Sequence, residues 1–343
     1  TKLVVNNATD PQRRHPFYPL TTISSGYDSP TCAVIARENG CRHAITLDSA
    51  RPSFENTKDS GKQIAEILDL KVKEYNSSKY MNRYDLIETE FIGLGTGGDD
   101  VVMASLETEL SGSLLFTGFH GDKVWSRWNH SPEEEIVRGD PSGCSLEEFR
   151  LRLGFINLPI PFIGCGRQES ITKISNSPEM APWQLNQTDY DRPIPRRIVE
   201  EAGIPREAFG QDKKAAARPY QTTEYEDPDL SEVLSPPSLE DFNKFSHKIP
   251  IYYSSWDKLR HKTLKPLFHF NNRAVNSVKL QKVFSFLGLP LPKKTLIPRK
   301  FGKIRSRHDL LFHWGICRLI HQRSHPELSL SSTKFDKTQQ RSD

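Results

Sequence analysis

The sequence reads Tyr18-Pro19-Leu20-Thr21-Thr22-Ile23-Ser24-Ser25-Gly26-Tyr27-Asp28-Ser29-Pro30 near one end, and this stretch decides the predicted fold. Residues 18–23 favour a β-strand, which ends directly in a turn rich in serine and glycine. Pro30 stands where proline is favoured in the first turn of a helix, and Ser29 suits the N-cap. We expect that helix over residues 31–38. The stretch therefore predicts a strand, a tight turn and a helix, in that order.

Strand and helix patterns continue to alternate after this stretch. Further strands are predicted over residues 41–47, 71–75 and 112–116, and helices over residues 59–70 and 97–110. Such alternation is typical of an α/β fold, a Rossmann-like parallel sheet with helices on both faces. The ligand of such a sheet is expected at the carboxyl ends of its strands. Beyond about residue 145 the pattern becomes mostly helical.

Composition divides the chain of 343 residues into three predicted parts. The α/β domain is expected over residues 1–220. An acidic segment rich in proline and serine, 221–248, is predicted to be a surface linker. Residues 249–343 are basic and predicted to be mostly helical. This last part could bind nucleic acid or an acidic partner, or could be a helical subdomain solvated by its own lysines.

The absence of certain patterns narrows the class of protein. No run of about 18 apolar residues occurs, so a membrane-spanning helix is excluded and no membrane partner is predicted. No secretory segment is visible near the first residues. The five cysteines are too few and too scattered for a disulfide framework or a paired-cysteine motif. We therefore expect a cytoplasmic protein.

The serine-rich turn has the chemistry of an anion site. A strand that turns into a helix directs backbone N–H groups to one place, where the helix dipole adds positive potential. Ser24, Ser25 and Ser29 add hydroxyl groups, and Gly26 allows close approach of the backbone. Asp28 would repel a phosphate unless a cation lay between them, and Mg²⁺ is the usual bridge. No Gly-Lys-Ser/Thr follows, so the turn is not a Walker A loop.

The turn resembles the SGGxDS loop of the N-type ATP pyrophosphatases, the PP-loop superfamily that includes asparagine synthetase, GMP synthetase and tRNA-modifying ligases. Residues 116–125, Phe-Thr-Gly-Phe-His-Gly-Asp-Lys-Val-Trp, look like the second aspartate segment in the synthetase domain of asparagine synthetase. Residues 204–214 resemble that domain's lysine-bearing segment, and residues 191–202 its preceding helix. The resemblance covers about residues 17–220 and does not include the glutaminase domain.

The resemblance implies roles for individual residues. Asp28 and Asp122 would hold Mg²⁺, and Lys213 would stabilise the charge that develops on the phosphate oxygens. The residues implied to bind ATP or pyrophosphate are Ser24, Ser25, Gly26, Tyr27, Asp28, Ser29, Leu47, Gly118 and Gly121. Two positions depart from the family's pattern, because Ser25 replaces a glycine and Lys123 replaces a glutamate.

The reaction that the resemblance implies is an amide-forming ligation driven by ATP. A substrate carboxylate would attack the α-phosphate and release pyrophosphate, and an amine or ammonia would then displace AMP. Ammonia would come from a separate glutaminase. Two alternatives stay open: an enzyme that adenylates a nucleic-acid base, which the basic C-terminal region favours, and a catalytically degenerate nucleotide-binding relative, which Ser25 and Lys123 favour.

A stripe of potential metal ligands lies outside the region of resemblance. His313, Cys317, His321 and His325 follow one another at intervals of four residues, so they share one face of a helix. Two neighbours on such a stripe could ligate zinc. The apolar residues around them favour instead a packed helix.

Overall fold

The structure, a computed structural model, describes residues 1–49, 58–93, 98, 100–128, 146–185, 190–211, 230–249 and 307–324. The chain forms two compact units. One consists of residues 1–244 together with 311–343, and the other of residues 245–310. The sheet and the candidate functional site both belong to the first unit.

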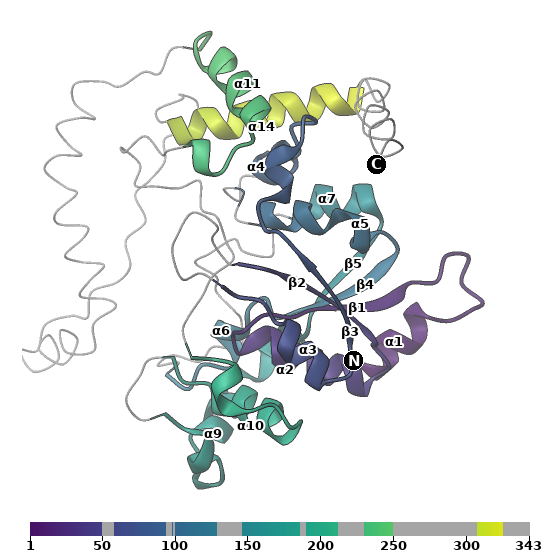
Figure 1. The fold of residues 1–343 in the computed structure, drawn as a ribbon, viewed down its shortest axis with the longest axis vertical. Coiled ribbons are helices and arrows are strands. Elements are labelled where there is room, and N and C mark those ends of the chain that lie inside the picture. Colours follow the sequence, from purple (N-terminus) through teal and green to yellow (C-terminus); the bar gives the residue numbers. More distant parts are fainter. Residues whose placement is uncertain are drawn as a thin grey trace, which may run out of the picture. The chain divides into compact units, whose positions relative to one another are not determined.

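Within the described residues, the first unit contains a sheet of five parallel strands in the order β3-β2-β1-β4-β5 (Figure 1). The strands are β1 (Tyr18–Thr22), β2 (His43–Leu47), β3 (Lys71–Tyr75), β4 (Ser113–Thr117) and β5 (Ile156–Pro159). In the register, Thr21 of β1 lies opposite Ala44 on one side and Phe116 on the other. The predicted Rossmann-like parallel sheet is therefore confirmed.

Helices cover both faces of the sheet, as Figure 1 shows. One face carries α1 (Lys2–Ala8), α2 (Asp28–Glu38) and α3 (Lys62–Ile67), and the other carries α5 (Glu107–Leu110) and α7 (Glu147–Leu153). The other helical segments among the described residues are η1 (Lys79–Asn82), α4 (Thr89–Ile92), η2 (Val101–Leu106), α6 (Gly121–Val124), α8 (Ile160–Ile163), η3 (Cys165–Arg167), α9 (Gln168–Ser175), η4 (Pro178–Trp183), α10 (Pro193–Glu201), η5 (Arg206–Ala208), η6 (Leu230–Glu232), α11 (Pro236–Ser246) and α14 (Arg307–Ser324). None of the described helices is long and apolar enough to cross a bilayer.

Four elements differ from the sequence-based expectation. Helix α2 was expected over residues 31–38 with Ser29 at its N-cap, but it begins at Asp28 and its N-cap is Tyr27. Strand β5 was not predicted, because four residues are too few to show alternation and the last of them is a proline. Proline is tolerated there because β5 lies at the edge of the sheet. The helix expected over residues 59–70 begins only at Lys62, since Ser60 pairs with Ser24 as an isolated bridge. The helix expected over residues 97–110 is largely the 3-10 helix η2.

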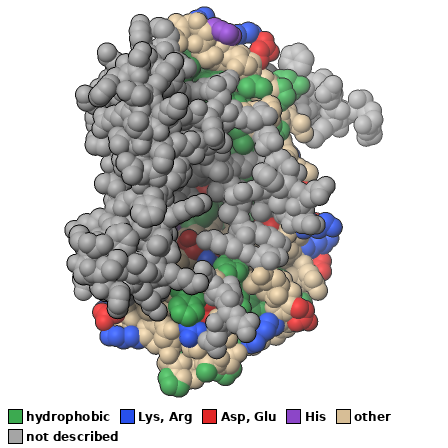
Figure 2. Space-filling model, turned by 90° about the vertical axis from the view of Figure 1, so that its left-hand side faces the viewer, with side chains coloured by type: hydrophobic (Ala, Val, Ile, Leu, Met, Phe, Trp, Pro, Cys, Tyr) green, Lys and Arg blue, Asp and Glu red, His purple; other side chains and the backbone are tan. Residues whose placement is uncertain are grey.

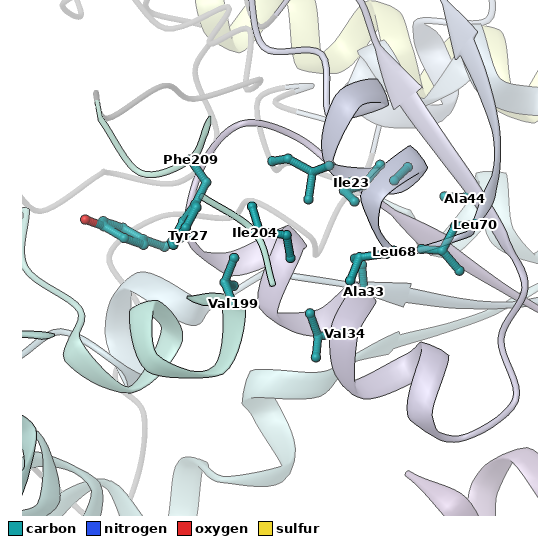
Figure 3. Close-up of a cluster of buried hydrophobic side chains, with 12 residues drawn as sticks. Ile23, Tyr27, Ala33, Val34, Ala44, Leu68, Leu70, Val199, Ile204 and Phe209 are labelled. Atoms are coloured by element: carbon teal, nitrogen blue, oxygen red, sulfur yellow. The ribbon is translucent and has the colours of Figure 1, made fainter. Parts of the chain in front are cut away.

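Helix α2 is fixed by two hydrophobic clusters. The first joins it to β2, α3 and α10 (Figure 3) and consists of Ile23, Tyr27, Ala33, Val34, Ala44, Ile64, Ala65, Leu68, Leu70, Val199, Ile204 and Phe209. The second joins it to α1, β4, α6 and α8 through Cys32 and Ala36. Small side chains at these positions let the helix lie close to the sheet, and close packing leaves it little room to shift. The N-terminus of α2 is therefore held firmly at the carboxyl edge of the sheet.

Helices α11 and α14 belong to the first unit although they lie far along the chain. Asp241 accepts hydrogen bonds from Trp314 Nε1 at 2.7 Å and from Arg318 Nε at 2.6 Å. The Phe242 ring contacts the Trp314 ring edge-on, with centroids 5.7 Å apart. The acidic segment predicted to be a surface linker thus contains a packed helix, because the apolar side of α11 is buried. The boundaries at residues 220 and 248 stay predictions, since residues 212–229 and 250–306 lie outside the described ranges.

Helix α14 also shows where the stripe of potential metal ligands lies. Leu311 and Trp314 are buried, whereas His313, Cys317 and His321 are exposed. His325 lies outside the described residues. The described part of the chain contains no group of three or more side chains that could hold a metal ion. The helix therefore packs through its apolar side, and the described part of the stripe faces solvent.

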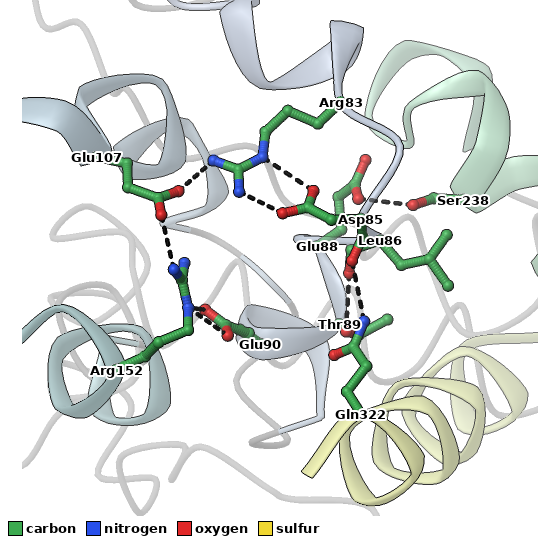
Figure 4. Close-up of polar contacts among 10 residues, drawn as sticks. All are labelled: Arg83, Asp85, Leu86, Glu88, Thr89, Glu90, Glu107, Arg152, Ser238 and Gln322. Carbon is green, nitrogen blue, oxygen red and sulfur yellow. Dashed lines mark hydrogen bonds and ion pairs between the residues drawn. The ribbon is translucent and has the colours of Figure 1, made fainter. Parts of the chain in front are cut away.

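A buried carboxylate connects the segment before α4 to the start of α11. Glu88 accepts hydrogen bonds from the Ser235 N–H and from the Ser238 hydroxyl, each at 2.6 Å. Figure 4 shows the second of these. Burial raises the pKa of Glu88, and these hydrogen bonds oppose the rise only in part. Arg152 lies in the same region and donates to Glu107 at 2.6 Å.

Replacing Glu88 should weaken the first unit measurably. In Glu88→Ala the Ser235 N–H and the Ser238 hydroxyl lose their buried acceptor, which is expected to cost about 1–3 kcal/mol in urea unfolding. Glu88→Gln keeps one acceptor oxygen and should cost less.

Glu88 should also make the folding stability depend on pH, and the direction of that dependence can be derived. Because the pKa of Glu88 is raised in the folded chain, folding binds its proton more tightly. The stability that protonated Glu88 contributes is fully present at pH values below the ordinary pKa range of a carboxyl group. It is lost as the pH rises through the raised pKa. Wild type should therefore lose stability relative to Glu88→Gln as the pH increases. A difference that stays constant with pH would contradict this account.

Candidate functional site

The sheet changes its direction of growth between β1 and β4. The chain passes from β1 to β2 and β3 on one side, and then returns to β4 and β5 on the other. In open α/β sheets, ligands bind in the crevice outside the carboxyl ends of two such strands. Residues 24–29 follow β1 and residues 118–122 follow β4, so two sequence-predicted segments lie at this place.

Glycine allows these two segments to touch. A Cβ atom on Gly118 would lie 2.7 Å from the backbone nitrogen of Ser29. One on Gly121 would lie 2.3 Å from Asp28 Oδ1. No side chain fits at either position without displacing the first turn of α2. Gly118, Gly121 and Asp28 are thus brought together, and the steric reason for both glycines is the approach of α2 to the end of β4.

Hydroxyl groups organise the turn itself. The Oγ atoms of Ser24 and Ser29 are 2.8 Å apart, and Ser24 Oγ accepts the N–H of Gly26 at 3.3 Å. Ser25 instead bonds to a residue outside the turn. Its N–H and its hydroxyl both donate to Asp59 Oδ1, at 3.2 and 2.7 Å. The N–H of Ser25, expected to face an anion, is therefore engaged by the protein.

The side chain of Tyr27 points into the core. It is 2% exposed, and its hydroxyl accepts a hydrogen bond from Arg196 of α10. The Arg196 guanidinium carbon also lies 5.2 Å from the centre of the Tyr27 ring. A Cβ atom on Gly210 would lie 2.2 Å from this ring. Tyr27 therefore anchors the turn to α10 and the segment after it, and only its backbone remains for a ligand.

A second arginine from the start of α10 holds Asp28. Arg192 Nη1 donates to Asp28 Oδ2, and the two side chains are 6% and 24% exposed. Burial lowers the pKa of Arg192, but the attraction of Asp28 and the hydrogen bond to it, with smaller effects of Tyr190 and Asp122, raise it overall. The guanidinium therefore stays charged, within electrostatic reach of both aspartates that were predicted to hold Mg²⁺.

The start of α10 is fixed by a buried aspartate. Asp191 is fully buried and accepts hydrogen bonds from Arg127 at 3.1 Å, from the Leu185 N–H at 2.8 Å and from Arg196 at 3.4 Å. Pro193 begins the helix at the next position but one, where proline is favoured. Arg192 is therefore presented from a rigid segment.

The described residues do not fit a preformed magnesium site at Asp28. Mg²⁺ needs carboxylate oxygens that can enter an octahedral shell. Oδ2 of Asp28 is engaged by Arg192, and Oδ1 is buried so close to Gly121 that a Cβ there would lie 2.3 Å from it. Magnesium stays a prediction that comes from the resemblance.

The other predicted site residues lie as follows. Leu47 is the last residue of β2, at the carboxyl edge of the sheet. Asp48, which follows it, accepts the Ser77 N–H at 3.0 Å. Lys213 lies outside the described residues, so its role stays a prediction.

Arg192 and Arg196 were missed by the sequence analysis as site residues. They lie four positions apart around the start of a helix, so they share one face, and this spacing was the available signal.

No family model and no curated protein matches the chain. Six solved protein chains match it in structure. One is described as a predicted subunit of tRNA methyltransferase from Methanocaldococcus jannaschii; it is 20% identical, with a TM-score of 0.26, over 58% of this chain and 95% of that chain. A likeness at this level carries no argument about function. The fold class follows from the strand order, and the likeness to asparagine synthetase stays a prediction.

The contact between the two turns can be tested by adding a methyl group. Gly121→Ala should lower the free energy of unfolding by about 1–3 kcal/mol, because the new Cβ would overlap Asp28. Gly166→Ala is the matched control, since a Cβ there meets no atom within 4 Å. Urea unfolding of both variants provides the measurement. Equal stability of Gly121→Ala and wild type would show that the turns are not in contact.

Proposed function

We propose that the chain binds ATP in the crevice outside β1 and β4 and cleaves it between the α- and β-phosphates. The observation that carries the proposal is the meeting of two turns at the point where the strand order reverses. The N-terminus of the 11-residue helix α2 lies at the same point. A helix N-terminus attracts phosphate through its unpaired N–H groups and its dipole. Cleavage between the α- and β-phosphates, rather than β and γ, is carried by the resemblance of residues 24–29 alone.

The charge at this place supports an anionic ligand. Arg192 is buried and carries its charge beside the first turn of α2. The described side chains next to it include Asp28, which it neutralises. A phosphate that reaches the turn therefore meets a neutralised carboxylate and a guanidinium, not an isolated negative charge.

The finer proposal is an ATP-dependent ligase that forms AMP and pyrophosphate. A carboxylate oxygen of the substrate attacks the α-phosphorus, the bond to the bridging oxygen breaks, and pyrophosphate leaves. The nitrogen of ammonia or an amine then attacks the acyl carbon, loses a proton, and AMP leaves. Alignment of the reactants and stabilisation of the phosphate charge would supply most of the rate, with Lys213 proposed for the second task.

A nucleotide-binding protein without turnover is the second candidate. The ion pair of Arg192 with Asp28 favours it, because that pair engages a carboxylate that the ligase mechanism of the resemblance would use.

A nucleic-acid-modifying enzyme has less support from the described residues. On the face drawn in Figure 2, their lysines and arginines lie in separate places next to acidic side chains. The densest basic stretch, 292–307, lies almost entirely outside the described ranges.

The products made from ATP distinguish these candidates. The chain is incubated with ATP, Mg²⁺, ammonium and a set of carboxylic acids, and AMP and pyrophosphate are measured. We expect both products with at least one acid. Asp122→Asn should abolish them, and the exposed Glu169→Gln should leave them unchanged.

The remaining outcomes are equally decisive. ATP binding without either product would support the second candidate. Failure to bind ATP in calorimetry would rule out both.

A further inference from the structure

We propose that Arg192 binds the nucleotide's phosphates directly and does beside Asp28 what a divalent cation would otherwise do. Binding of ATP or pyrophosphate at this site then requires no divalent metal. The proposal rests on the proposed function, because it concerns the same crevice. The resemblance implies that Mg²⁺ takes part in the site, whereas this proposal does not require it. The two predict different results for one measurement, the effect of Mg²⁺ on the binding of ATP or pyrophosphate.

The guanidinium has donors to offer a ligand. It carries five N–H groups in a rigid fork. Within the described residues, the guanidinium of Arg192 donates one side-chain hydrogen bond, from Nη1 to Asp28. The proposal assigns the remaining N–H groups to a phosphate, so that the ion pair is kept. A planar fork of this kind suits the bidentate binding of phosphate oxygens.

Aromatic packing places this guanidinium next to the turn. Its central carbon lies 5.0 Å from the centre of the Tyr190 ring. The hydroxyl of Tyr190 in turn lies 3.6 Å from the Cβ position of Gly26, in the middle of the turn. Arg192 is thus located from two sides, by Asp28 at the first residue of α2 and by Tyr190 against the turn. Little side-chain freedom is left to lose when a ligand binds.

Magnesium would have to compete with this arrangement. To bind Asp28 through Oδ2, the metal must displace Arg192 from a place where its side chain is 6% exposed. The displaced guanidinium would be left buried and without its carboxylate, which is costly. The other oxygen of Asp28, Oδ1, is buried next to Gly121. Keeping the ion pair and binding phosphate on its far side avoids both costs.

Calorimetry of the wild-type chain tests the proposal without any substitution. Inorganic pyrophosphate and ATP are titrated in EDTA and again in excess Mg²⁺. We expect both ligands to bind in EDTA, with dissociation constants within about threefold of those in Mg²⁺. Binding in Mg²⁺ alone would overturn the proposal while leaving the proposed function intact. Absence of binding in both buffers would defeat the proposed function itself.

Two variants then assign the effect to Arg192. Arg192→Gln should weaken pyrophosphate binding in EDTA by about 10- to 100-fold, because a charge-assisted hydrogen bond is lost. Mg²⁺ should restore part of that binding, since Asp28 is then open to the metal. Arg197→Gln is the matched control on the same helix, because Arg197 is 34% exposed and pairs with Glu179 and Glu201. It should bind pyrophosphate as wild type does.

A third variant covers the case in which Arg192→Gln fails to fold. The double substitution Arg192→Gln with Asp28→Asn removes both charges of the pair at once and leaves neither unpaired. Circular dichroism should show a folded chain, and pyrophosphate binding in EDTA should fall as in the single variant. Binding of the double variant at wild-type strength in EDTA would show that Arg192 does not contact the ligand.

Discussion

The carboxylate of Asp28 pairs with the guanidinium of Arg192 and lies close to Gly121, where no side chain would fit, and the arrangement of the crevice depends on this meeting. Each partner comes from a different part of the chain. Asp28 begins α2, Gly121 follows β4, and Arg192 precedes α10. A larger residue at 121 would displace the first turn of α2, and a different charge at 192 would remove the ion pair. The turn between β1 and α2 has its shape because these three segments meet there.

An ion pair in this position is a poor source of stability. Desolvation of two charges offsets most of their attraction, so the hydrophobic clusters around α2 are what hold the fold. The pair has a larger effect on what can bind. A phosphate at the turn would be repelled by the Asp28 carboxylate alone. The ion pair with Arg192 brings the local charge close to neutral and adds N–H donors. Arg196 and Tyr27 form a second arginine contact from the same helix, but that contact is buried and serves packing.

The sequence predicts the sheet well because its strands are separated by clear turns. Lys71–Tyr75 has the predicted bounds, whereas β5 is too short for its periodicity to show. The meeting of Gly118 and Gly121 with Asp28 follows from the rule that strand ends share an edge. Arg192 could not be assigned in this way. Its role depends on how α10 lies against α2, which is a tertiary contact between residues more than 160 positions apart. The hydrogen bonds of Ser25 to Asp59 could not be predicted for a similar reason, because Asp59 was expected in a helix.

The Asp241 contacts with Trp314 and Arg318 make the first unit discontinuous in sequence. The chain leaves it after Lys244 and returns at Leu311, so the second unit is an insertion rather than an appendage. Domains generally fold as units while the chain is being synthesised, N-terminal parts first. Here the ribosome must complete the whole insertion before α14 can dock. We therefore expect a fragment that ends near residue 220 to leave the surface under α14 uncovered, however complete its sheet.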